Sequence, residues 1–257
     1  MASKQDHPSN GNNQVDGLAH GLANPATPRA RPGCNRWLEL WRSQLGKKYA
    51  MAISGFILIA YVLVHLLGTL KVFAGPEATN AYADWLRTVG SPLLPEYFAI
   101  WALRVILLLS VIVHIVAAVQ LVRLARAARP VEYAAREHRT VDIASRTMRW
   151  GGVIITLFII FHVLHLTTGH AHHDFSADVY RNIVSGFQQW YVSLFYIIAC
   201  AALALHIYHG LWSALQTMGS TYRGFHRGGR SPAVVVAVVI GLGNISLPLA
   251  VMVGVIE

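Results

Sequence analysis

The sequence is poor in charge. Only 13% of its 257 residues are Asp, Glu, Lys or Arg, whereas 54% are hydrophobic and the mean hydropathy is positive. A soluble domain usually carries about 25% charged residues. This composition argues against a soluble domain, and with a net charge of +9 it is typical of an integral membrane protein with basic ends.

Cysteine is also scarce. The two cysteines, Cys34 and Cys200, lie far apart in the chain, and no CxxC or CxxCH word occurs. These absences exclude a disulfide framework, a paired-cysteine metal site and a covalently attached c-type haem.

The first 36 residues lack any apolar run and are rich in Asn, Gly, Pro and Ser. Such a composition predicts disorder, and the missing apolar core near residue 10 argues against a cleavable signal. We therefore expect two parts: a cytoplasmic, largely disordered basic arm over residues 1–42, and a membrane domain over residues 43–257.

Long apolar runs are abundant beyond the arm. Each run has about 20 residues, which is enough to cross roughly 30 Å of hydrocarbon as a helix. The runs show no polar stripe at a 3.6-residue period, which a soluble helical core would need. The prediction is an all-α integral membrane bundle of five transmembrane helices, near Tyr49–Leu70, Phe98–Leu121, Trp150–Thr168, Trp190–Met218 and Pro232–Ile256.

Basic residues are unevenly shared between the loops. The arm, the second loop and the fourth loop together hold 17 Lys and Arg, whereas the other side holds only Lys71, Arg87 and Arg181. The positive-inside rule then predicts a cytoplasmic N-terminus and places Glu257 outside.

Histidines occur in each of the first four spans and not in the fifth. Ionisable side chains inside a bilayer are costly and usually face the interior of a bundle at a functional site, although a single histidine can simply hydrogen-bond to a neighbouring helix. The six histidines are His65, His114, His162, His165, His206 and His209.

Depth sorts these histidines into two levels. Counted from the cytoplasmic ends of their spans, His65 lies roughly 25 Å and His162 roughly 20 Å into the membrane, whereas His114 lies roughly 14 Å and His206 roughly 17 Å. Two histidines at each of two heights suit the axial ligation of two six-coordinate haems. Without a CxxCH word, the haems would be b-type.

Four stretches resemble the five-helix, di-haem cytochrome b membrane-anchor subunit of succinate dehydrogenase and fumarate reductase. The resemblance covers about residues 43–256. The stretches are "GKKYAMAISGFILIAYVLVHLLGTL" (46–70), "RVILLLSVIVHIVAA" (104–118), "SRTMRWGGVIITLFIIFHVLHL" (145–166) and "HIYHGLWSALQTMG" (206–219).

The resemblance implies iron ligands, one from each of the first four helices. His65 and His162 would hold the outer haem, and His114 and His206 the inner haem, which is also the pairing that depth predicts.

The second histidine of each doublet, His165 or His209, would be a neighbour that contacts a propionate or the quinone. Some fumarate-reducing relatives carry an acid two residues before the fourth ligand; here that position is Ala204, which favours succinate oxidation.

The resemblance also implies partners in a bacterial cytoplasmic (inner) membrane. A flavoprotein with FAD would oxidise succinate, and an iron–sulfur subunit would dock on the basic cytoplasmic face. The two b haems would connect that subunit with a quinone, menaquinone in our expectation, within the lipid bilayer. We expect no nucleic-acid partner.

Several charged residues are candidates for contacts with the haem propionates or the quinone. Arg104 is the one arginine within a span, and it could pair with a propionate or a quinone oxygen, or extend outward to the interface. The outer quinone candidates are Glu77, Asp84, Arg104 and His170; the inner candidates, which could also contact propionates, are Lys47, Lys48, Arg146 and Arg149.

Other functions stay open at this stage. The same histidines would suit the cytochrome b anchor of a hydrogenase, formate dehydrogenase or nitrate reductase, or a quinol:fumarate reductase. A haem-free anchor or metal transporter is a further alternative, because "GHAHHD" offers divalent-metal ligands at His170, His172, His173 and Asp174.

Overall fold

In the computed structural model of the protein, the described residues are 39, 41–128, 140–219 and 231–257, and the side chains of 140–146 and 231 lie outside the description. The helices discussed below all belong to one unit, Leu40–Glu257. The predicted disordered arm over residues 1–42 falls almost entirely outside the described residues, as does Cys34.

The described part of the chain is helical and contains no strand. Five of its helices are long and apolar enough to cross a membrane, so the predicted all-α, multi-pass membrane architecture is confirmed. A 3₁₀ turn (Leu70–Ala74) extends the first, and a π-helical turn (Val163–Thr167) extends the third. The five are α2 (Gln44–Thr69), α4 (Phe98–Ala127), α5 (Thr140–His162), α7 (Trp190–Thr217) and α9 (Ser231–Met252).

The helix ends differ from the prediction where local signals act. The last span was expected to reach Ile256, but α9 ends at Met252. Gly254 has a φ of +74° and donates its N–H to the carbonyl of Val251, which is the arrangement that ends a helix with a left-handed glycine.

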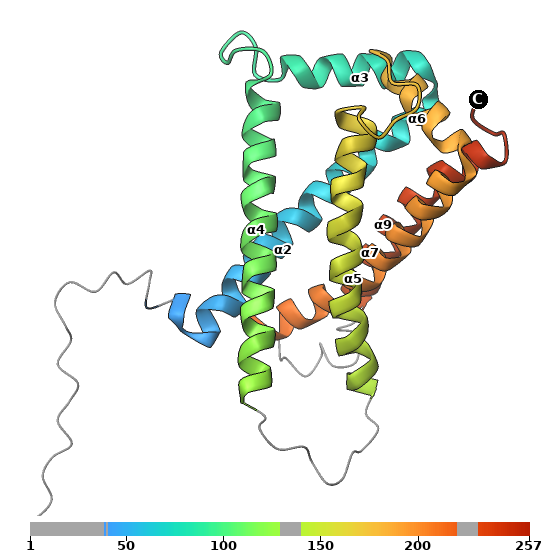
Figure 1. Ribbon diagram of the computed structural model, residues 1–257. Coiled ribbons are helices and arrows are strands. Elements are labelled where there is room, and N and C mark those ends of the chain that lie inside the picture. Colours follow the sequence, from blue (N-terminus) through green and yellow to red (C-terminus); the bar gives the residue numbers. More distant parts are fainter. Residues whose placement is uncertain (1–38, 40, 129–139, 220–230) are drawn as a thin grey trace, which may run out of the picture. The chain divides into compact units, whose positions relative to one another are not determined.

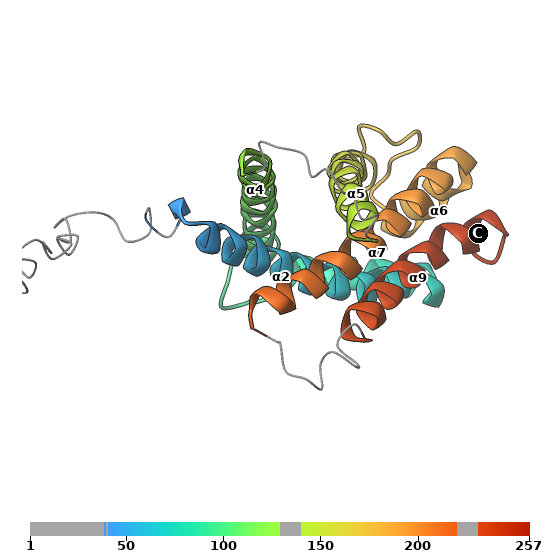
Figure 2. The same ribbon diagram turned by 90° about the horizontal axis from the view of Figure 1, so that it is seen from below.

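The four histidine-bearing spans do not all pack closely on one another in the described part of the chain. Helix α7 packs against α5 and α9, and α2 packs against α4. Within the described residues, the backbones of α2 and α5 do not pack closely on each other, and neither do those of α4 and α7. Figure 1 shows α4 and α5 upright with α2, α7 and α9 oblique to them, and Figure 2 views α4 and α5 nearly along their axes.

Two short helices at the predicted outer end were missed by the sequence analysis. Helix α3 (Pro76–Thr88) begins with a proline, and α6 (Val179–Gln188) begins after the capping residue Asp178. The two helices contact each other, and Figure 1 shows α3 lying across the ends of the spans. Both are too short and too polar to register as apolar runs.

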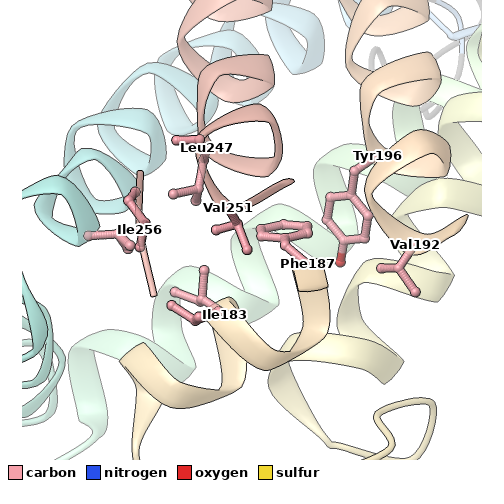
Figure 3. Close-up of a cluster of buried hydrophobic side chains, with 10 residues drawn as sticks. Ile183, Phe187, Val192, Tyr196, Leu247, Val251 and Ile256 are labelled. Carbon is pink, nitrogen blue, oxygen red and sulfur yellow. The ribbon is translucent and has the colours of Figure 1, made fainter. Parts of the chain in front are cut away.

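Helix α6 is anchored by the largest buried hydrophobic cluster. Ile183 and Phe187 of α6 pack with Tyr196 of α7 and with Leu247 and Val251 of α9 (Figure 3). This cluster fixes α6 on the outer ends of α7 and α9, and it holds Tyr196 in place.

Asn80 of α3 caps α6 from outside that helix. Its side-chain carbonyl accepts the backbone N–H groups of Val179 and Tyr180 at 3.1 and 3.2 Å, and its amide donates to Asp178 at 2.9 Å. The backbone N–H of Arg181 also donates to the Asp178 carboxylate, and these donors hold the pKa of Asp178 below its ordinary value. One side chain thus joins the two outer helices.

We expect Asn80→Ala to loosen this junction. The substitution leaves two N–H groups at the start of α6 without their acceptor, and loss of such a cap costs about 1 kcal/mol. Amide hydrogen exchange should rise in residues 179–187 of α6. Glu77→Ala is the control, because it changes an exposed position of α3, the helix that carries Asn80. Equal exchange in the two variants would show that Asn80 does not hold α6.

Candidate functional site

Two histidines face each other near the outer end of the bundle. His65 lies on α2 and His162 is the last residue of α5, and their ring centroids are 5.8 Å apart with an angle of 83° between the planes. Tyr61 stacks on His65 with centroids 5.5 Å apart. The two imidazoles therefore meet across helices whose backbones are not in close contact.

A second pair joins the other two histidine-bearing helices. His114 on α4 and His206 on α7 have ring centroids 6.3 Å apart. Nδ1 of His114 lies 3.1 Å from the carbonyl oxygen of Met51 and 3.3 Å from Oγ of Ser54. A carbonyl oxygen only accepts, so this contact assigns the proton to Nδ1 and leaves the Nε2 lone pair of His114 available to a metal.

Glycines show that the pairs occupy different levels. A Cβ on Gly55 of α2 would lie 3.3 Å from Cε1 of His114, and one on Gly152 of α5 would lie 3.8 Å from Cε1 of His206. Gly55 precedes His65 by ten residues, and Gly152 precedes His162 by ten. Ten helical residues span about 15 Å. Helices α2 and α5 therefore each contribute a histidine to the outer pair and, about 15 Å away along the helix, lie beside the inner pair at a glycine.

The residues of both pairs fit haem iron in donor type and spacing. Metal–imidazole bonds are about 2 Å long, so two imidazoles on opposite sides of one ion have ring centroids about 6 Å apart. Neutral imidazole is a common axial ligand of haem. The spacings of 5.8 and 6.3 Å agree with this value, and glycine rather than a larger residue stands beside each ring of the inner pair.

The second histidine of the first doublet points elsewhere. His165 is 1% exposed, and its ring stacks on Phe161 and His172 and lies against Gly186 of α6. The π turn explains the separation, because Thr168 N–H bonds to Val163 O five residues earlier. In the wider π turn, His165, three residues after His162, no longer lies on the same face of the helix as His162.

The second doublet stays within a regular α-helix. His209 lies about one turn beyond His206 on α7, and its ring is 4.8 Å from that of Tyr208. It is His206 whose ring meets His114.

Tyr196 is a site residue that the sequence analysis missed. Its hydroxyl lies 3.3 Å from Nδ1 of His162 and 3.1 Å from Nδ1 of His165. The only signal in the sequence was a tyrosine deep in an apolar helix, where the hydroxyl needs a partner.

The charged residues that we expected near propionates or the quinone make contacts with nearby protein groups, and their expected roles stay predictions. The Arg104 guanidinium lies 4.8 Å above the ring of Trp101 on the exposed side of α4. Lys47 is buried, and its ammonium donates to the carbonyls of Trp41 and Arg42 at 2.6 and 3.1 Å. Lys48 and Arg149 are exposed, and the Arg146 side chain lies outside the described residues.

The other outer quinone candidates lie on α3 and in a loop. Glu77 is exposed, and Asp84 forms an ion pair with Arg87 of the same helix. Nδ1 of His170 lies 2.9 Å from Oγ1 of Thr168. None of these described contacts joins a candidate to the histidine pairs.

The "GHAHHD" loop uses its side chains in local contacts. His172 donates from Nε2 to the carbonyl of Asn182 at 2.8 Å and accepts the N–H of Asp174 at Nδ1. Asp174 pairs with Arg181 at 2.7 Å, and His173 stacks on His172. Among the described residues, no three His, Cys, Asp or Glu side chains gather closely enough to hold a metal ion.

Comparisons with known proteins do not add to this geometry. Neither a scan against protein-family models nor searches of curated proteins and of solved structures found a match to this chain.

Proposed function

We propose that this chain is the membrane anchor and electron-transfer subunit of a succinate:menaquinone oxidoreductase in a bacterial cytoplasmic membrane. The observation that carries the proposal is the meeting of four histidines from four spans as two pairs, at 5.8 and 6.3 Å. When bound, two b haems would supply one-electron transfer between an iron–sulfur subunit and the quinone.

The chain's own contribution is to place and orient imidazoles. His65 and His162 would hold the outer group, and His114 and His206 the inner group. The Met51 carbonyl fixes the His114 ring through Nδ1, a second contact of the kind that sets ligand orientation and basicity. The apolar helices around both pairs would keep water away.

The partner assignment has separate support. The resemblance of four stretches to the di-haem anchors, and Ala204 in place of an acid, favour succinate oxidation. The 17 basic residues on one side favour docking of the iron–sulfur subunit, beside the FAD-bearing flavoprotein, on the cytoplasmic face. These partners are part of the proposal.

Reduction by succinate tests the proposal. We expect the purified complex to contain two low-spin b haems per chain and both to be reduced by succinate through the co-purifying flavoprotein. Difference spectra and extraction of the haem measure these quantities. Absence of a Soret band would refute the di-haem assignment.

A different result would redirect the partner assignment. Haems that dithionite reduces and succinate does not would reject succinate oxidation and point to the anchor of a hydrogenase, formate dehydrogenase, nitrate reductase or quinol:fumarate reductase. The identity of the co-purifying subunit separates these alternatives.

A further inference from the structure

We infer that Tyr196 is a positioning residue for His162: its hydroxyl accepts the Nδ1 proton of His162 and donates its own proton to Nδ1 of His165. This inference rests on the proposed function, with His162 as the iron ligand of the outer doublet, and deepens it, because it names a residue that tunes the outer haem.

The hydrogen-bond inventory leads to this assignment. A phenol has one O–H to donate and lone pairs that accept, and the Tyr196 oxygen lies near two imidazole nitrogens, at 3.1 and 3.3 Å. The hydroxyl can donate to only one of them. An iron ligand that binds through Nε2 must carry its proton on Nδ1, so His162 donates and the closer His165 accepts.

The surroundings fix this hydroxyl in place. Tyr196 is 5% exposed, and its ring makes edge contacts with Phe158 and Phe187 at centroid distances of 5.0 and 4.8 Å. The His165 ring is held between Phe161 and His172 at 5.3 and 4.8 Å. Both bonds therefore join side chains that have little freedom to rearrange.

Of the four proposed iron ligands, only His162 shares a hydrogen bond with the Tyr196 hydroxyl. Accepting the Nδ1 proton makes the imidazole a stronger donor to iron and favours the ferric state. The corresponding partner of His114 in the inner pair is the carbonyl of Met51 on α2, and the inner ligand His206 lies ten residues, about 15 Å, further along α7 from Tyr196. Loss of the tyrosine hydroxyl should therefore raise the reduction potential of the outer haem only.

A redox titration of Tyr196→Phe in the intact complex tests the inference. Phenylalanine keeps the ring contacts, so we expect both haems to be retained. At a fixed potential near the midpoint, the ferrous-to-ferric ratio of the outer haem should rise about tenfold, which equals about 59 mV for a one-electron couple. The outer haem is the one that disappears in His162→Ala.

Tyr191→Phe is the matched control, because it removes a phenol hydroxyl from an exposed position of the same helix. It should leave both potentials unchanged. An unchanged outer potential in Tyr196→Phe, or equal shifts of both haems, would overturn the inference. If the wild-type complex holds two haems but Tyr196→Phe shifts neither reduction potential, only the role of Tyr196 is refuted. A wild-type complex without haem would refute the proposed function.

A milder replacement covers the case in which Tyr196→Phe fails to assemble. Site-specific 3-fluorotyrosine at position 196 keeps the ring and the hydroxyl but makes the oxygen a weaker acceptor. The outer potential should rise by less than in Tyr196→Phe while the inner potential stays constant. No shift in this variant would equally overturn the inference.

Discussion

Replacement of His206 by alanine is expected to remove the inner haem and leave the outer haem in place. The ring of His206 meets His114 at 6.3 Å, and no other described residue offers that pair a second imidazole at this spacing. Loss of one of two haems lowers the extracted haem by about half, because each site requires its own two axial ligands. His209→Ala, one turn away, is the control and should keep both haems.

The outer doublet gives the same contrast on another helix. His162→Ala should remove the outer haem, whereas His165→Ala should keep it, since the His165 ring lies against α6 and His172 instead of His65. Free imidazole added to His162→Ala or His206→Ala should restore the missing haem by entering the vacated space. Retention of both haems in His206→Ala, or loss of the outer haem in His165→Ala with retention in His162→Ala, would contradict the pairing.

Gly186→Ala is expected to disrupt the outer end of the protein. A Cβ at this position would lie 2.7 Å from Cε1 and 3.0 Å from Nε2 of His165, and 3.1 Å from Nε2 of His172. His165 is a buried ring stacked on both sides, so it cannot move aside as a flexible chain end would. Overpacking of this kind costs about 1 to 3 kcal/mol, partly offset by about 1 kcal/mol of helix propensity.

Thermal unfolding of the purified complex measures this effect. Gly151→Ala is the control, because its Cβ would meet nothing closer than a carbonyl oxygen at 4.0 Å, and it should be neutral or stabilising. In a His165→Ala background, the cost of Gly186→Ala should fall, since the ring that makes the two shortest contacts is gone and only the His172 contact at 3.1 Å remains. Equal costs in the two backgrounds would show that His165 is not the residue against which Gly186 packs.

Much of the fold was predictable because the signals for it are local. Hydrophobicity over about 20 residues specifies a spanning helix without reference to any other segment, and all five spans are present. The error at the end of α9 came from a single glycine, whose backbone conformation the apolar pattern around it does not reveal. Helices α3 and α6 are stabilised by contacts with each other and with the bundle, so no local signal of theirs was strong enough.

The candidate site also has a part that the sequence predicts and a part that it does not. Helix rise converts residue numbers to depth, which is why the sequence alone matches His65 with His162 and His114 with His206. Helix rise does not place the charged groups in the same way, because a long side chain such as Lys47 or Arg104 can turn to carbonyls or aromatic rings nearby, and their expected roles stay predictions.

The sequence by itself determined the number of spans, the helical class and the two levels of histidine, since these follow from composition and a constant rise per residue. Only the tertiary structure decided that a π turn rotates His165 away from His65, that Tyr196 stands between the two histidines of the doublet, and that Asn80 caps a helix 99 residues further along the chain. These features depend on contacts between segments far apart in sequence, whose meeting no local pattern records.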